Sequence, residues 1–154
     1  MLNSPNDPYD LSRFVQAQEA TYRQAISELR AGRKRSHWSW FILPQLRGLG
    51  SSPMSTRYAI GSLAEAKAYL EHPILGARLR ECVAAMNEHT GMSANEILGE
   101  TDARKFHSCL TLFAQAAGSE PLFSDALLRY FSGVPDAASL ALLRRGQGPK
   151  VDER

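Results

Sequence analysis

The chain has 154 residues, of which 44% are hydrophobic and 22% are charged, and its formal net charge at pH 7 is +2. This length and composition fit one globular domain and exclude an intrinsically disordered chain. The 18 basic and 16 acidic side chains are so nearly balanced that charge alone does not predict binding to nucleic acid.

Apolar residues recur at three- and four-residue spacing along most of the chain, which is typical of amphipathic helices. The first expected helix runs from Asp10 without interruption and ends at Gly32. Capping boxes at Ser62–Glu65 and Ser93–Glu96 predict the starts of two shorter helices. Between these two, Pro73 suits the first position of a further helix.

Three more helices are expected in the second half of the chain. Thr101 or Asp102 can cap the first of them. Pro121 suits the start of the second, and Gly133 marks its end. Asp136 is a candidate cap for the last helix.

No pair of alternating strand patterns is present, although residues 57–60 could form a short extended piece. Helical and loop signals mix between residues 36 and 55. We therefore predict an all-α fold, a single multihelical domain of about six or seven helices over residues 10–145. Residues 1–9 and 146–154 are expected to be flexible termini.

Cys82 and Cys109 each lie within an apolar helical pattern, so we expect two buried thiols rather than a disulfide. No pair of histidines on one helix has the spacing of metal ligands, and neither a metal nor a cofactor is predicted. No segment resembles a signal peptide or reaches the length of a membrane span. A cytoplasmic protein without a membrane partner is therefore expected.

Gln18 is the first polar residue that does not fit a simple core, because it lies on the apolar stripe of the first helix. A buried amide without partners costs about 1–3 kcal/mol. Two interpretations stay open: Gln18 bonds a loop carbonyl, or it faces a pocket. In the second case Glu19, one residue further round, could border the same opening.

Residues 37–52 concentrate aromatic, polar and glycine residues, including both tryptophans of the chain. This segment is either an aromatic plug at one end of the helices or a ligand site. In a ligand site, indole rings would stack on a base, and a glycine turn with an arginine would hold a phosphate. The candidate ligand-binding residues here are His37, Trp38, Trp40, Gln45, Arg47, Gly48 and Gly50. The turn is not a dinucleotide fingerprint, because no strand precedes it and the third glycine is missing.

Asp102, Lys105 and Ser108 follow one another at steps of three and so share one side of a helix, with Thr111 nearby. They are either a helix cap with an ordinary solvated ion pair or a polar cluster that points into a cleft. Helix N-termini attract anions, which favours a ligand site at this position.

Seven short runs of the sequence together resemble the bacterial domain-of-unknown-function family numbered 1810. They are residues 14–18, 32–34, 37–45, 48–50, 72–76, 102–105 and 111–113. The longest run has the pattern His-Trp-x-Trp-Phe-x-x-Pro-Gln, and the resemblance covers about residues 10–145. Where family members usually carry two successive serines, this chain has His107 and Ser108, which leaves Ser108 and Thr111 for a polar role.

The resemblance implies a small, mostly helical, cytoplasmic protein whose family has no settled activity. The motif layout is also similar to that of the NADAR families, helical proteins associated with ADP-ribose and N-glycosidic chemistry. The hypothesis is therefore a site for a nucleotide- or ADP-ribose-like small molecule, with N-glycoside hydrolysis as the candidate reaction.

Cleavage of a ribosyl–base bond passes through an oxocarbenium-like state, which a nearby carboxylate stabilises. Asp102 is the first choice for this carboxylate and Glu19 is the competing choice. Lys105 and Arg47 would hold anionic groups, and Trp38 or Trp40 would stack on a ring. Gln18, Gln45 and Ser108 would then donate or accept hydrogen bonds.

A different class of function is a non-catalytic module that docks a protein partner through exposed Trp38 and Trp40. Burial decides between the two hypotheses, because a docking surface must be exposed whereas a ligand site is concave. Nucleic-acid binding is the weakest hypothesis, since the cations near the end of the first helix also suit the helix dipole. These cations are Arg30, Arg33, Lys34 and Arg35.

Overall fold

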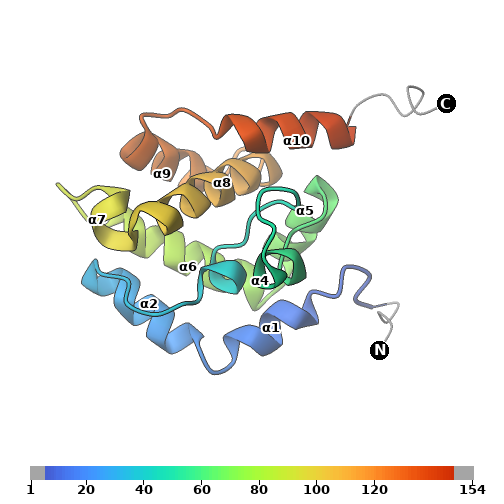
Figure 1. Ribbon diagram of the computed structural model, residues 1–154, viewed down its shortest axis with the longest axis horizontal. Coiled ribbons are helices and arrows are strands. Elements are labelled where there is room, and N and C mark those ends of the chain that lie inside the picture. Colours follow the sequence, from blue (N-terminus) through green and yellow to red (C-terminus); the bar gives the residue numbers. More distant parts are fainter. Residues whose placement is uncertain (1–5, 148–154) are drawn as a thin grey trace.

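The computed structural model describes residues 6–147, which form ten helices. They are α1 (Ser12–Gln18), α2 (Tyr22–Ala31), α3 (Ser39–Ile42), α4 (Pro53–Arg57), α5 (Leu63–Glu71), α6 (Leu75–Asn87), α7 (Ala94–Leu98), α8 (Glu100–Ala116), α9 (Leu122–Phe131) and α10 (Ala137–Gln147). Figure 1 shows α1 and α2 along one side and α9 and α10 along the opposite side, with α6 and α8 between them. None of the helices in this range is long and apolar enough to cross a membrane.

The predicted all-α class holds, but the predicted number of six or seven helices is wrong. Two short helices, α3 and α4, occupy the segment where helical and loop signals mix. The first predicted helix is also divided into α1 and α2. At the break, the N–H groups of Glu19 and Thr21 bond carbonyls three residues back, at Gln16 and Gln18. This tight turn interrupts the four-residue bonding of an α-helix, so the chain changes direction before α2 begins.

Several helix ends agree with the sequence signals. The Ser93 hydroxyl and the Glu96 carboxylate form a reciprocal capping box at the start of α7. Gly32 ends α2 with a φ of 76°, a left-handed conformation that favours glycine. Asp136 caps α10, since its carboxylate accepts a hydrogen bond from the Ser139 N–H at 2.9 Å.

Helix α8 is the central element, because it packs against α5, α7, α9 and α10. Its inner face buries Phe106, Cys109, Leu110 and Phe113 completely. The expected burial of both cysteines is confirmed, and both are free thiols. Burial raises the pKa of the Cys82 thiol to about 12, so this thiol is unreactive at neutral pH.

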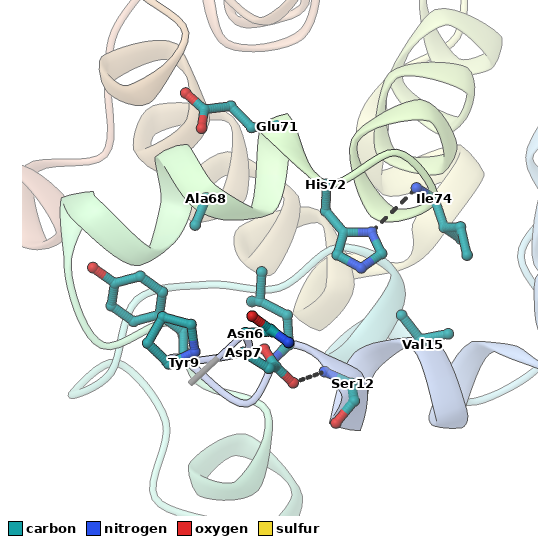
Figure 2. A pocket seen from close by; sticks show the side chains of 11 residues that line it. Asn6, Asp7, Tyr9, Ser12, Val15, Ala68, Glu71, His72 and Ile74 are labelled. Carbon is teal, nitrogen blue, oxygen red and sulfur yellow. Dashed lines mark hydrogen bonds between the residues drawn. The ribbon is translucent and has the colours of Figure 1, made fainter. Parts of the chain in front are cut away.

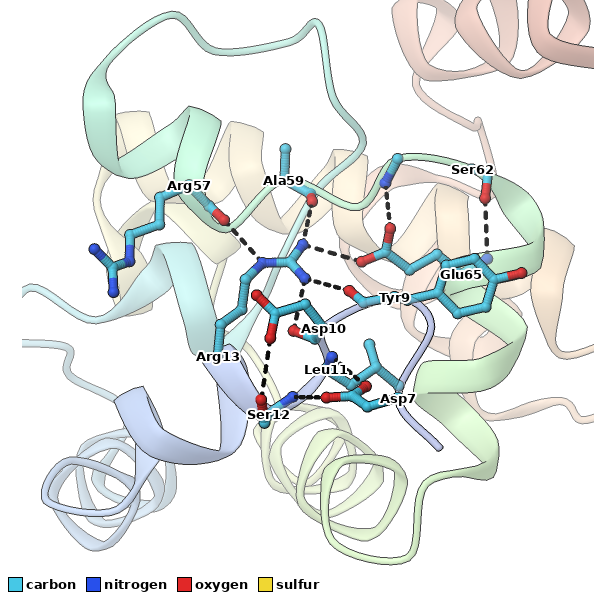
Figure 3. A network of polar contacts seen from close by, with 11 residues as sticks. Asp7, Tyr9, Asp10, Leu11, Ser12, Arg13, Arg57, Ala59, Ser62 and Glu65 are labelled. Atoms are coloured by element: carbon cyan, nitrogen blue, oxygen red, sulfur yellow. Dashed lines mark hydrogen bonds and ion pairs between the residues drawn. The ribbon is translucent and has the colours of Figure 1, made fainter. Parts of the chain in front are cut away.

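The segment between α3 and α5 is held against the rest of the molecule by backbone and arginine contacts. Leu46 and Ile60 form an isolated parallel β-bridge, so the short extended piece expected at residues 57–60 has one paired residue. The Arg13 guanidinium on α1 ties this segment to the N-terminal residues through five hydrogen bonds (Figure 3). Its acceptors, at 2.7–3.0 Å, are the carbonyls of Tyr9, Asp10, Arg57 and Ala59 and the Glu65 carboxylate.

The predicted flexible ends fall largely on residues 1–5 and 148–154, which lie outside the described residues. The described part of the N-terminal segment contacts α1 directly. The Asp7 carboxylate accepts hydrogen bonds from the N–H groups of Leu11 and Ser12 at 2.7 and 3.1 Å. The domain boundaries stay a prediction.

Candidate functional site

A buried carboxylate on α2, Glu28, organises the loop that leads to the tryptophans. It accepts five hydrogen bonds at 2.6–3.1 Å: from the Gln24 amide, the Arg35 N–H, the N–H and hydroxyl of Ser36, and the Trp38 indole N–H. Burial opposes ionisation, but these donors outweigh it and lower the pKa of Glu28 to about 2. Residues 35–38 are therefore held by an ionised carboxylate.

Beyond this loop lies a cavity of about 230 Å³, which we call the tryptophan cavity. It lies between the segment 34–40 and the first turns of α8. Its walls are formed by Lys34, His37, Trp38, Ser39, Trp40, Thr101, Asp102 and Lys105. Residues more than 60 positions apart in the sequence therefore meet around one small space.

Two ammonium groups flank one carboxylate in the tryptophan cavity. The Asp102 Oδ2 atom lies 2.8 Å from Lys34 Nζ, and Asp102 Oδ1 lies 3.8 Å from Lys105 Nζ. The Lys34 side chain is only 6% exposed, whereas Asp102 and Lys105 are about one fifth exposed. The cluster carries a formal charge of +1, so the Asp102 carboxylate neutralises only one of the two lysines.

Each of these lysines also lies over an indole ring. Lys34 Nζ is 4.7 Å from the Trp38 ring centroid, and Lys105 Nζ is 5.0 Å from that of Trp40. Both distances are within the range of cation–π attraction. Trp38 is completely buried, whereas Trp40 is partly exposed and presents ring surface to the cavity.

The Ser39 hydroxyl is an unsatisfied polar group in the wall of the tryptophan cavity. Ser39 is 3% exposed, and its Oγ atom has no hydrogen-bond partner among the described residues. A buried hydroxyl without a partner destabilises a fold by about 1–3 kcal/mol, so such groups are rare in native structures.

A second cavity, of about 380 Å³, lies on the other side of Lys105, and we call it the basic cavity. Thr101 and Lys105 line both cavities. The other polar residues of its wall are Gln45, Ser55, Arg104, His107, Ser108 and Asp136. The loop that closes it is tightly folded, because a Cβ atom on Gly50 would lie 2.6 Å from Ser55 Oγ. Only glycine fits at this position.

The structure brings together eight of the predicted site residues in these two cavities. His37, Trp38, Trp40 and Asp102 line the tryptophan cavity, Lys105 lines both, and Gln45, Gly50 and Ser108 line the basic cavity. They come from two distant parts of the chain, the segment 37–50 and the first half of α8.

The profile of a family described as a protein of unknown function, DUF1810, matches residues 8–143. The chain belongs to the DUF1810 family. The structure is also similar to the crystal structure of the conserved hypothetical protein Rv1873 from Mycobacterium tuberculosis, with a TM-score of 0.88 and 52% sequence identity. That match covers 89% of this chain and 98% of the mycobacterial one. No curated protein matches.

The family resemblance seen in the sequence is thus confirmed, whereas a relation of DUF1810 to the NADAR families stays a prediction. The matched region, residues 8–143, includes every residue that lines the tryptophan cavity and the basic cavity.

Two predicted residues of this DUF1810 protein, Gln18 and Glu19, lie outside both cavities. Gln18 is buried, and its amide donates to the Phe41 carbonyl at 2.7 Å and lies 3.2 Å from the Tyr69 hydroxyl. Its Oε1 atom accepts from Arg78 at 3.2 Å. Gln18 therefore has a structural role, as in the first interpretation, but the carbonyl that it bonds lies in α3 and not in a loop. Glu19 is exposed at the end of α1.

Three further predicted residues, Arg47, Gly48 and Thr111, also lie elsewhere. Arg47 lines a cavity of about 450 Å³ beside the Arg13 network of Figure 3. Gly48 has a φ of 103°, and a Cβ atom there would contact Leu142 on α10 at 3.4 Å. The Thr111 hydroxyl is fully used within the fold, because it donates to the His107 carbonyl and accepts from the Asp136 N–H, both at 2.8 Å.

Sequence reasoning missed Lys34, Ser39 and Thr101 in the tryptophan cavity and Arg104 and His107 in the basic cavity. Lys34 was interpreted as part of the cationic end of a helix, and nothing local indicates its pairing with Asp102. The spacing of Thr101, Arg104 and Lys105 on one helix was the available signal, since residues three and four apart share a face.

A larger cavity of about 510 Å³ lies between the N-terminal segment, α1 and α5, and Figure 2 shows its lining. Its polar groups serve helix ends. Asp7 caps α1, and the His72 Nδ1 atom accepts hydrogen bonds from the N–H groups of Ile74 and Leu75 at 3.1 and 3.2 Å. The Asp7 carboxylate and the His72 ring are therefore already committed to the ends of helices.

Proposed function

We propose that the tryptophan cavity and the basic cavity form one site for a nucleotide- or ADP-ribose-like ligand. The observation that supports this most is the meeting of two indole rings, two ammonium groups and one carboxylate around a small cavity with an unpartnered buried hydroxyl. Aromatic, cationic and hydroxyl groups together suit a ligand with a flat ring, a sugar and a negative charge.

The exposure of each side chain in the two cavities suggests which part of the ligand it would contact. Trp40 is partly exposed and would stack on the ring of the ligand, whereas buried Trp38 forms the floor beside Lys34. Lys105 is accessible from both cavities and would pair with an anionic group.

N-glycoside hydrolysis is the reaction we propose for this site. The oxygen of water adds to the anomeric carbon as the C–N bond breaks, and the electron pair of that bond stays on the base nitrogen. The water gives up one proton and the base nitrogen takes one up, so the products are a sugar hydroxyl and a free base. Asp102 would stabilise the positive charge that develops on the sugar, and its ion pair with Lys34 would fix its position. Glu19 is not proposed for this role, because it lines neither cavity. The similarity of motif layout to NADAR makes ADP-ribose the first ligand to test.

Docking of a protein partner through both tryptophans has less support. Trp38 has no exposed surface, and its indole N–H donates to Glu28 at 2.9 Å. Nucleic-acid binding through the cations near the end of α2 is likewise weakened, because Arg30 pairs with Glu81 and Lys34 with Asp102. The proposal therefore takes a small molecule as the partner of a cytoplasmic protein.

Calorimetric titration with ADP-ribose, together with chromatography of the reaction products, tests this proposal. We expect saturable binding by the native protein and a loss of about tenfold or more in affinity for Trp40→Ala and for Lys105→Ala. Lys67→Ala is the matched control, because Lys67 is exposed on α5 and lines neither cavity. Equal affinities of Lys105→Ala and Lys67→Ala would contradict the proposed site. Release of free adenine from ADP-ribose that Asp102→Asn abolishes would support the hydrolysis.

A further inference from the structure

We infer that the basic cavity is a phosphate subsite, so that the ligand class is a nucleoside phosphate rather than a nucleoside or a free base. The inference rests on the proposed function, because it assumes that the ring of the ligand lies in the tryptophan cavity. It adds Arg104 to the residues that hold the ligand and makes the His107 ring a fixed part of the cavity wall.

The basic cavity has an excess of positive charge. Arg104 and Lys105 are adjacent on α8 and both line it, whereas Asp136 is the only acidic residue in its described lining. The carboxylate of Asp136 is committed to the start of α10, where its Oδ2 atom accepts from the N–H and hydroxyl of Ser139 at 2.9 and 2.6 Å. The basic side chains are thus only partly neutralised from within the cavity.

The basic groups are available for a ligand to different degrees. Among residues 6–147, Arg104 forms an ion pair with Glu100 alone, at 3.6 Å. Both side chains are more than 70% exposed, so this ion pair contributes little to stability. An incoming phosphate could replace it at small cost, since a guanidinium binds phosphate oxygens in bidentate geometry. Lys105 reaches the same space from its position beside Trp40.

His107 is held rigidly at the wall of the basic cavity. Its ring stacks on Phe131 with centroids 4.1 Å apart and an interplanar angle of 5°. Its Nε2 atom lies 2.7 Å from the Val134 carbonyl, which can only accept, so Nε2 carries a proton. The position of this ring is therefore fixed before any ligand binds, which reduces the entropy lost on binding.

Uncharged donors complete the basic cavity. The side-chain amide of Gln45 lines it, and none of the hydrogen bonds among the described residues uses that amide. Ser55 lies beside it, held close to Gly50 by the tight loop. An amide, a hydroxyl and the Arg104 and Lys105 cations around one space match the several oxygen acceptors of a phosphate.

Lys105 lines both cavities, and its position indicates which part of the ligand would lie in which cavity. Its ammonium lies over Trp40 on one side and lines the basic cavity on the other. A ring stacked on Trp40 and a phosphate among Arg104 and His107 would therefore both be within reach of Lys105. This arrangement fits a ring linked to a phosphate through one sugar.

The test compares adenosine with AMP by calorimetric titration of the full-length protein at one ionic strength. For the native protein we expect AMP to bind at least about tenfold more tightly than adenosine. Arg104→Ala should reduce this ratio by about three- to tenfold and leave the affinity for adenosine unchanged. Arg23→Ala, at an exposed position on α2, should leave both affinities unchanged.

The outcomes separate this inference from the proposed function. Equal affinities of the native protein for adenosine and AMP would overturn the phosphate subsite but leave the tryptophan cavity as a ring-binding site. An unchanged ratio in Arg104→Ala, with an unchanged melting temperature, would also overturn it. Absence of binding by both ligands and by ADP-ribose would overturn the proposed function itself.

Discussion

Glu28 is an acidic residue on the buried face of α2, where the other buried residues are Ala25, Ile26 and Leu29. Its carboxylate is stable there because five donors surround it, four of them from the segment between α2 and α3 that carries Lys34 and His37. Glu28 thus holds this polar loop in one position, where it forms part of the wall of the tryptophan cavity.

The lowered pKa of Glu28 predicts an acid-sensitive contribution to stability. The pKa is about 2 in the folded protein and about 4.5 for an ordinary glutamate. A depressed pKa means that the contribution is complete above pH 4.5 and is lost as the pH falls toward 2. Urea denaturation of the native protein should show a loss of about 2–3 kcal/mol from this group over that range.

Glu28→Gln separates this effect from general acid denaturation. We expect the variant to be less stable than the native protein at pH 7 and to lose less further stability between pH 4.5 and 2. The same substitution at exposed Glu19 should leave the pH profile unchanged. Parallel profiles for the native protein and Glu28→Gln would show that this carboxylate is not the acid-sensitive group.

The ion pair of Lys34 with Asp102 predicts strong energetic coupling between two residues that are far apart in the sequence. Asp102→Asn would leave the nearly buried Lys34 ammonium without its carboxylate, which should cost about 2 kcal/mol or more. Lys34→Met combined with Asp102→Asn should cost less than the sum of the two single changes, since both then remove the same interaction. Denaturation of the four proteins of this cycle measures the coupling, and strictly additive costs would refute it.

At the scale of helices, the prediction from sequence succeeded where the determining contacts are local. The caps of α5 and α7 use a serine and the residue three positions later, so they are visible in the sequence itself. The break between α1 and α2 is different. Gln18 bonds Phe41, Tyr69 and Arg78, which are 23 to 60 positions away, so periodicity alone predicted one continuous helix.

The capping box of α7 predicts a measurable change in a short helix. Ser93→Ala removes the hydroxyl that accepts the Glu96 N–H at 3.0 Å, and it should lower the free energy of unfolding by about 1 kcal/mol. Ser93→Asp should retain most of the stability, because a carboxylate oxygen can accept the same hydrogen bond. Guanidinium denaturation measures both variants, and an equal loss in Ser93→Asp would argue against capping as the cause.

Part of the candidate site could be predicted from the sequence, because many of its residues lie in two segments with a distinctive composition. The tryptophans and the polar face of α8 are visible in the sequence, and they do meet in the structure. The division into two cavities and the position of Lys34 were not predictable. They depend on how the loop after α2 packs against α7 and α8. The Lys34 N–H bonds the Ile97 carbonyl on α7 at 2.8 Å, and the Lys34 ammonium pairs with Asp102 on α8.

At the scale of the whole molecule, α8 connects the core to the site. One of its faces is buried against four other helices, and another lines both cavities. Phe113→Ala would leave a void at the centre of this packing and should cost about 3–5 kcal/mol. Thermal denaturation should show one transition at a much lower temperature. Leu128→Ala, at a residue that is 67% exposed, should change the melting temperature little.

Lys105 forms part of both cavities, and this shared wall has a thermodynamic consequence. An anion that draws its ammonium into the basic cavity moves that charge relative to Trp40 and Asp102. The occupancies of the two cavities are then linked, and the factor by which adenosine alters the affinity for free phosphate must equal the factor by which phosphate alters the affinity for adenosine. The affinity of the protein for adenosine would thus depend on bound phosphate, and the reverse, through the Lys105 side chain alone.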